Sequence, residues 1–193
     1  MTAMTPTTPN SWAAAARSGA AERILDAAAA LFAEHGVAAV GMDDIARAAG
    51  CSRATLYRYF ANRELLRSAY VLREMSRALD HLASTAPPSG SAPERLVAVI
   101  ESAVAYVRDR PELLAWFSSE DFAVGPVLAE NAGALAAAAS RSRVAADLPA
   151  LGDPQVFDWV VRVIVGLLGH PGASAAYEHE LLVRFVGPIA DHG

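Results

Sequence analysis

Several kinds of residue and pattern are scarce in this chain of 193 residues, and each absence excludes something. The one cysteine, Cys51, cannot form an intramolecular disulfide and indicates a reducing compartment, so we expect a cytoplasmic protein. No apolar run approaches the roughly 18–20 residues of a membrane span, and the longest, "VVRVIVGLLG", contains Arg162. The start, "MTAMTPTTPNSW", lacks the basic and apolar regions of a signal peptide. We therefore expect no membrane partner, and a disordered lead over residues 1–19.

Lysine is absent, and all 16 residues of the Lys and Arg class are arginine. Together with the abundant alanine, this indicates the codon bias of a GC-rich genome. The charges are unevenly distributed: residues 1–84 contain nine Arg against eight Asp or Glu, and residues 85–193 contain seven against thirteen. The two parts of the chain are therefore expected to have different partners.

Catalytic and metal-binding patterns are also missing. The five histidines form no H-x₃-H or HExxH pattern, and a single cysteine cannot build a zinc site. The chain contains no Gly-rich phosphate loop and no G-x-S-x-G motif. We predict that it is not an enzyme, holds no metal and needs no cofactor.

The apolar residues follow a helical period throughout, and no segment alternates as a strand does. A Pro-rich linker is expected over 84–93, "STAPPSGSAP". Helices are expected up to Gly36 and then over about 42–49, 52–60, 62–82, 94–109, 111–118, 124–146, 154–169 and 174–190. We predict an all-α fold, in which a three-helix domain over 20–66 is linked by a fourth helix to a larger helical domain over 67–193.

Residues 42–61 meet the requirements of a helix-turn-helix. Two short helices can cross steeply only with a small residue at the crossing and a glycine at the turn, and Ala46 and Gly50 fill these places. Apolar residues face inward on both helices: Ile45, Ala49, Leu56 and Phe60.

The face of the second helix opposite Leu56 and Phe60 points outward. The small Ala54 on this face lets the helix approach the floor of a DNA groove. Arg53 or Arg58 can bind guanine there.

Further side chains suit phosphate and base contacts. Thr55 can touch a base edge or a thymine methyl, and the hydroxyls of Tyr57 and Tyr59 suit phosphate oxygens. Arg63 offers a second phosphate contact at the start of the next helix. The candidate DNA-binding residues are Ser52, Arg53, Ala54, Thr55, Tyr57, Arg58, Tyr59 and Arg63. The alternative, in which the tyrosines only pack and the arginines are only solvated, fits the turn spacing less well.

Residues 20–66, "AAERILDAAAALFAEHGVAAVGMDDIARAAGCSRATLYRYFANRELL", closely resemble the DNA-binding domain of the TetR family of bacterial transcriptional regulators. The family pattern is F-x-x-x-G, then I-A-x-x-A-G-V-S, then T-L-Y-x-H-F. Here Cys51 replaces the usual Val, Tyr59 the common His and Arg63 the usual Lys, and Gly41 stands where Ser or Thr often begins the helix.

The resemblance implies a C-terminal domain that dimerises and binds a small molecule. Apolar bands on the last two predicted helices make them candidates for a homodimer interface, with monomer core as the alternative. The candidate interface residues are Phe157, Val161, Ile164, Leu168, Leu182 and Phe185. The candidate pocket residues, for which core packing is again the alternative, are Tyr106, Trp116, Phe117 and Phe122. Glu120 and Asp121 beside them favour a neutral or cationic apolar ligand.

These features predict a homodimeric repressor that binds a double-stranded DNA operator and releases it when a small apolar ligand binds. In the alternative hypothesis, a DNA-binding regulator responds to a protein partner through its C-terminal domain.

Overall fold

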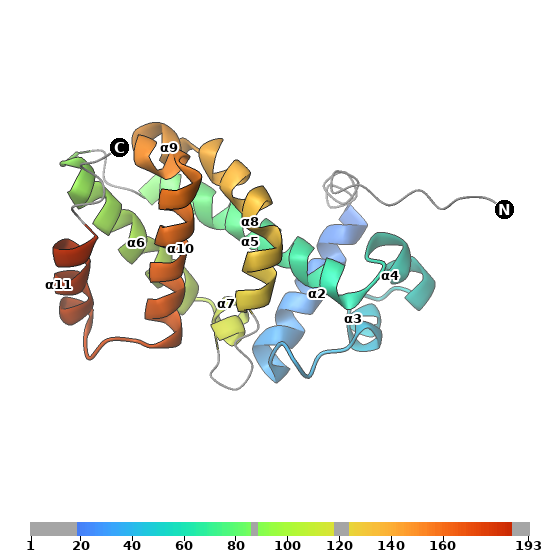
Figure 1. Cartoon of the computed structure of the whole chain (residues 1–193). Helices are drawn as coiled ribbons and strands as arrows, with labels where there is room; N and C mark the ends of the chain where they lie inside the picture. The colour runs from blue at the N-terminus through green and yellow to red at the C-terminus, as the bar shows by residue number, and fades with distance from the viewer. Residues whose placement is uncertain (1–18, 86–88, 118–123, 187–193) are drawn as a thin grey trace. The chain divides into compact units, whose positions relative to one another are not determined.

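The computed structural model describes residues 19–85, 89–117 and 124–186, shown as ribbons in Figure 1. All regular structure in these ranges is helical, which confirms the predicted all-α fold. The chain divides into two compact units, Met1–Tyr70 (unit 1) and Val71–Gly193 (unit 2). The predicted disordered lead lies outside the described residues except for Gly19, where the first described helix begins.

Unit 1 contains α2 (Gly19–His35), α3 (Met42–Ala48), α4 (Arg53–Tyr59) and the first two turns of α5 (Arg63–Thr85). Its core is apolar, and Phe32 of α2 meets Tyr70 of α5 edge to face with ring centroids 5.4 Å apart. The other large core side chains are Ile24, Leu25, Ile45, Leu56, Phe60 and Leu66. Gly36 ends α2 with a φ of +78°, a conformation that glycine adopts without strain.

Unit 2 contains the rest of α5, then α6 (Ala92–Arg108), α7 (Pro111–Leu114) and the 3₁₀ turn η1 (Ala115–Phe117). It continues with α8 (Val124–Ser140), α9 (Arg143–Asp147), the 3₁₀ turn η2 (Pro149–Gly152), α10 (Pro154–Gly169) and α11 (Ala175–Phe185). Helix α6 packs against both α10 and α11, and α10 also packs against α8. The side chains at this centre include Leu96, Ile100, Val160 and Leu182.

A partly buried ion pair ties α6 to α11 inside unit 2. Arg108 on α6 donates to both carboxylate oxygens of Glu178 at 2.8 and 2.9 Å, and also to the carbonyl oxygen of Leu167 at 3.1 Å. The backbone N–H of Gly172 donates to the same carboxylate at 2.8 Å. These hydrogen bonds, with that of Arg108 first, hold the pKa of Glu178 below its ordinary value.

The structure differs from the sequence prediction in two helices. The single helix predicted over 124–146 ends at Ser140, and a new helix begins because the Ser142 hydroxyl accepts the backbone N–H of Ala145. The helix predicted over 111–118 is one turn of α-helix followed by a 3₁₀ turn. The end of the last predicted helix, 187–190, lies outside the described residues, and α11 ends at Phe185.

None of the helices within the described ranges combines the length and the apolar character that a membrane crossing requires.

Candidate nucleic-acid interface and ligand cavities

The turn between α3 and α4 depends on one glycine. Gly50 has a φ of +63°, in the left-handed region that other residues enter at a cost. Backbone N–H groups close the turn: that of Cys51 donates to the carbonyl of Ala46 at 3.0 Å, and that of Gly50 to the carbonyl of Arg47 at 3.2 Å. Ala46 itself is 3% exposed, which agrees with a close crossing of the two helices.

Burial on one side of α4 determines which side faces solvent. Leu56 is fully buried and Phe60 is 3% exposed, so both anchor α4 in the core of unit 1. On the opposite side Ala54 and Arg58 are exposed, and the ring of Tyr57 is 38% exposed. Ala54, Tyr57 and Arg58 of the predicted outward face are therefore exposed to solvent in unit 1.

Hydroxyl groups stabilise the start of α4. The Ser52 side chain accepts the backbone N–H of Thr55 at 3.1 Å, and the two hydroxyl oxygens lie 3.0 Å apart. Ser52 is thus the N-cap of α4, while Thr55 is half-buried and shares its hydroxyl with the cap.

The cations of α4 have partners within unit 1. Arg53 donates to the carboxylate of Asp43 on α3 at 2.9 Å, and its guanidinium carbon lies 5.9 Å from the centre of the Tyr57 ring. Arg58 lies 5.4 Å from the ring centre of Tyr59, which is half-buried. Both guanidinium groups remain on the surface, where a phosphate or a base can compete for them.

Arg63 is placed differently from the other cations. Its Nη2 donates to the carbonyl oxygens of Val37 and Ala38, both at 2.7 Å. This side chain therefore holds the loop between α2 and α3, a role that its position in the sequence did not indicate.

The pair formed by Asp43 and Arg53 was also missed from the sequence. The two residues are ten positions apart on different helices, so only the crossing of α3 and α4 brings them together. Asp44 lies in the first turn of α3, where its negative charge suits the helix dipole, and its carboxylate accepts the backbone N–H of Gly41 at 3.2 Å.

Tyr106 lines a cavity of about 440 Å³ between α5 and α6 of unit 2. Arg110 lies over its ring at 3.6 Å, and the His81 ring is 4.9 Å away between centroids. Thr85, Ser102, Ala105 and Asp109 complete the lining. Burial raises the pKa of the Tyr106 phenol. Trp116 and Phe117 do not line this cavity, Trp116 is 2% exposed, and Phe122 lies outside the described residues, as do Glu120 and Asp121.

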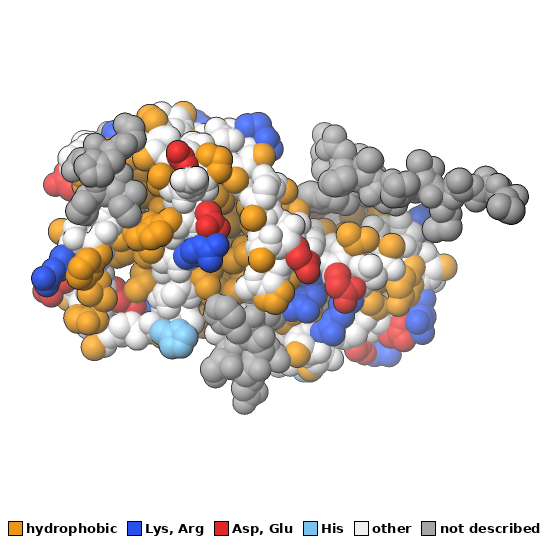
Figure 2. All heavy atoms as spheres, in the orientation of Figure 1, with side chains coloured by type: hydrophobic (Ala, Val, Ile, Leu, Met, Phe, Trp, Pro, Cys, Tyr) orange, Lys and Arg blue, Asp and Glu red, His pale blue; other side chains and the backbone are white. Residues whose placement is uncertain are grey.

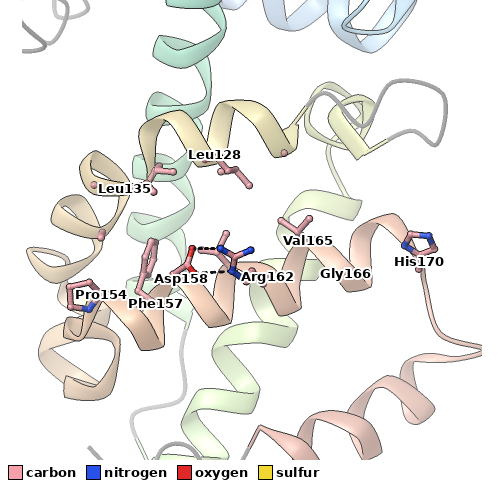
Figure 3. Close-up of a pocket in the computed structure, with 15 residues that line it drawn as sticks. Leu128, Leu135, Pro154, Phe157, Asp158, Arg162, Val165, Gly166 and His170 are labelled. Atoms are coloured by element: carbon pink, nitrogen blue, oxygen red, sulfur yellow. Dashed lines mark hydrogen bonds and ion pairs between the residues drawn. The ribbon is translucent and has the colours of Figure 1, made fainter.

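A second hollow of about 510 Å³ lies between α8 and α10, and we call it the α8–α10 groove (Figure 3). Its lining from α10 includes Phe157, Asp158 and Arg162, and its lining from α8 includes Leu128 and Leu135. Sequence reasoning missed the groove, although small residues recur on α8 at helical spacing: Gly125, Ala129, Ala132, Gly133 and Ala136.

The predicted interface residues are not equally accessible. Phe157, Leu168 and Leu182 are buried within the protomer, at 8%, 5% and 3% exposure. Val161 and Ile164 are half-buried, whereas Phe185 is 60% exposed. Only the last three have surface to offer a second copy.

Within the ranges that the structure describes, no three His, Cys, Asp or Glu side chains come close enough together to hold a metal ion.

Comparisons with known proteins agree with this geometry. The family model described as "Bacterial regulatory proteins, tetR family" matches residues 24–70. The chain is 43% identical over 189 residues to the uncharacterized HTH-type transcriptional regulator Rv1255c of Mycobacterium tuberculosis, with 92% of this chain and 89% of that protein covered. It is 38% identical over 132 residues to the HTH-type transcriptional repressor LfrR of Mycolicibacterium smegmatis, with 58% and 66% covered.

The fold has solved counterparts. The crystal structure of the TetR family repressor AlkX from Dietzia sp. superposes with a TM-score of 0.63 at 22% identity and covers 91% of this chain and 97% of that one. The family match over residues 24–70, the relative that is similar over most of its length and this shared fold all agree with the helix-turn-helix described above. The chain belongs to the TetR family of bacterial transcriptional regulators and is a DNA-binding regulator of transcription.

Proposed function

We propose that the chain is a homodimeric repressor that reads its operator with α4 and releases it when a small molecule binds unit 2. The observation that carries the DNA-binding part is the exposed face of α4, on which Ala54, Tyr57 and Arg58 face solvent while Leu56 is fully buried.

In this proposal each side chain of α4 has a separate task on DNA. Arg58, and Arg53 once it leaves Asp43, bind guanine edges in the major groove. Ala54 allows close approach, and Tyr57 and Tyr59 contact phosphates. Ser52 and Thr55 act chiefly by fixing the start of the helix, since their hydroxyls already bond there.

Two copies are needed because one recognition helix reads few base pairs. In helix-turn-helix dimers, two such helices occupy successive major grooves about 34 Å apart. The dimer forms through unit 2, to which Phe185 contributes exposed apolar surface and Val161 and Ile164 contribute the rest of theirs.

The cavity at Tyr106 is the proposed ligand site. Its volume lies within the range of small-molecule pockets, and ring, hydroxyl and charged groups converge on it. His81 and Thr85 in its lining belong to α5, the helix that begins in unit 1. A ligand that moves these side chains therefore acts on an element that both units share, and it shifts the dimer toward a spacing that no longer fits DNA.

The test combines binding and release. Genomic fragments selected by the full-length protein are bound again in the presence of substituted phenols, aromatic carboxylates or n-alkanols. We expect at least one compound to raise the melting temperature and to lower DNA affinity at least tenfold, and Tyr106→Ala to abolish both effects. DNA release by a co-purifying protein, with no response to any compound, would favour the alternative regulator controlled by a protein partner.

A further inference from the structure

The ion pair of Asp43 and Arg53 joins the two helices of the helix-turn-helix at the surface of unit 1. Arg53 Nη1 donates to Asp43 Oδ2 at 2.9 Å, and the side chains of Arg53 and Asp43 are 65% and 51% exposed. Over α3 and α4, Figure 2 shows acidic and basic side chains next to one another at the surface. Since a pair this exposed adds little to stability, its value to the protein lies elsewhere than in holding the fold.

Both side chains keep hydrogen-bonding groups that their neighbours do not use. Within the described ranges, Nε and Nη2 of Arg53 have no acceptor, and Oδ1 of Asp43 has no donor. The guanidinium of Arg53 also lies 5.9 Å from the centre of the Tyr57 ring, so it is held on two sides. The next residue, Asp44, is by contrast engaged on both oxygens, by a backbone N–H at the start of α3 and by Arg47. Asp43 is thus the carboxylate of α3 that remains available beside α4.

We propose that Asp43 is a specificity-determining residue, which together with Arg53 reads one G·C base pair in one orientation. Arg53 turns from Asp43 onto N7 and O6 of the guanine, and Asp43 accepts the groove-facing hydrogen of the cytosine N4 amino group. Arg53 is the first residue of α4, and the first residues of a recognition helix are those that contact base edges. The inference rests on the proposal that α4 reads the operator, and it adds a residue of α3 to that contact.

The order of hydrogen-bonding groups in the ion pair matches that base pair. In the major groove, G·C presents two acceptors, N7 and O6 of guanine, and then a donor, the cytosine amino group. The ion pair presents two guanidinium donors and then a carboxylate acceptor. O6 and N4 are themselves hydrogen bonded across the base pair at about 2.9–3.0 Å, close to the 2.9 Å between Arg53 Nη1 and Asp43 Oδ2. A small movement of the two side chains therefore brings all three groups into register with the bases.

The other base pairs present a different order of groups. An A·T pair offers acceptor, donor, acceptor in either orientation, so Asp43 would face an acceptor and one nitrogen of Arg53 would face a donor. In the reversed G·C pair, Asp43 would face guanine N7. A carboxylate without a donor in the groove loses its hydrogen bond and is repelled by the phosphates. Asp43 therefore lowers the affinity for DNA in general, and lowers it least where a cytosine amino group is in place.

Double-mutant cycles between protein and DNA test this with the full-length chain. The DNA is a fragment selected by the wild type, and each cytosine of a half-site is replaced in turn by the pyrimidinone nucleoside that lacks the amino group. Each guanine is likewise replaced by its deaza analogue, which lacks the N7 acceptor. Fluorescence anisotropy gives the loss of affinity for the wild type, Asp43→Ala, Arg53→Ala and Arg58→Ala. Glu34→Ala is the matched control, since Glu34 is an exposed carboxylate of unit 1 on α2.

We expect one base pair of each half-site to respond to both replacements. There the wild type should lose at least tenfold in affinity when the amino group is removed, whereas Asp43→Ala should lose less than threefold. Removal of N7 from the guanine of the same pair should cost the wild type at least tenfold and Arg53→Ala less than threefold. The control should respond as the wild type does. Because each loss is measured within one variant, a substitution that weakens folding or binding in general does not alter the result.

Several results would overturn the inference. If only one of the two residues couples to a base, if neither does, or if each couples to a different base pair, Asp43 and Arg53 do not read one pair together. The proposed reading of the operator by α4 stands in these cases as long as Arg53→Ala or Arg58→Ala is insensitive to the loss of N7 from one guanine. If both arginine variants respond as the wild type does at every guanine, α4 does not read the operator, and the inference fails with the proposed function.

Discussion

Replacing Arg63 by Met should destabilise unit 1, although its place at the start of α5 suggests a phosphate contact. Methionine keeps much of the length and apolar stem of the side chain and removes the guanidinium. The change therefore eliminates two hydrogen bonds of 2.7 Å, to the carbonyls of Val37 and Ala38, with little change in volume.

The size of the effect follows from these bonds. A hydrogen bond from a charged donor contributes about 1.5–3 kcal/mol, and two bonds that share one nitrogen contribute less than twice that. The Val37 side chain is fully buried, so its carbonyl has limited access to water as a substitute. We expect a loss of about 2–4 kcal/mol, which for a unit of this size lowers the melting temperature by roughly 8 °C or more.

The assay compares Arg63→Met with Arg58→Met. Denaturant unfolding followed by circular dichroism gives stability, and fluorescence anisotropy on a selected DNA fragment gives affinity at several salt concentrations. Arg58 is exposed and has no buried acceptor among its described contacts, so its variant should keep wild-type stability and lose DNA affinity. Unchanged stability of Arg63→Met, together with a salt slope flatter by about one unit, would mean that Arg63 contacts a phosphate and does not hold the loop.

Three further changes test separate parts of the structure. Gly50→Ala should cost unit 1 about 1–2 kcal/mol in denaturant unfolding, because φ is +63° while space for the methyl group is free. Asp43→Asn should raise affinity for any DNA severalfold in anisotropy titrations at low salt, since it releases Arg53 and removes a negative charge beside it. Glu178→Gln should lower the melting temperature at pH 7. The hydrogen bond from Arg108 holds the pKa of Glu178 below its ordinary value of 4.5, so the charged carboxylate stabilises the folded chain. The wild type should lose this stabilisation as the pH falls below 4.5 and through the folded-state pKa, whereas Glu178→Gln has no such stabilisation to lose.

Each of these has a clear negative outcome. The turn would not depend on glycine if Gly50→Ala unfolded like the wild type. An unchanged or reduced DNA affinity of Asp43→Asn would mean that Arg53 does not approach DNA. Identical pH dependence of melting for Glu178→Gln and the wild type would place the acid sensitivity on other carboxylates.

Local signals made the helix-turn-helix predictable from the sequence. The glycine at the turn, the small residue at the crossing and the two apolar anchors all lie within sixteen residues, and the structure shows Gly50 with positive φ and Ala46 and Leu56 buried. Ser52 begins α4 as its position indicated. Short-range rules of this kind need no knowledge of the rest of the chain.

The rest of the site depended on contacts between distant residues. Arg63 donates to Ala38, which lies 25 positions away in the sequence, and Arg108 pairs with Glu178, which lies 70 positions away. Contacts between residues so far apart leave no periodic pattern in the sequence. In unit 2 the sequence does not distinguish the aromatic residues that line a cavity from those in the core. Tyr106 lines a cavity, whereas Trp116 is buried. Apolar bands on α10 likewise did not reveal that Phe157 packs inside the protomer.

A comparison of selected DNA sequences tests whether α4 reads the operator. Wild-type protein and Arg58→Ala are each used to select fragments from a random DNA library, and the bound fragments are sequenced. We expect an inverted repeat for the wild type and loss of the preference for guanine at one position of each half-site in the variant. If both selections show the same preferences at every position, Arg58 does not contact the bases and α4 does not read the operator through it.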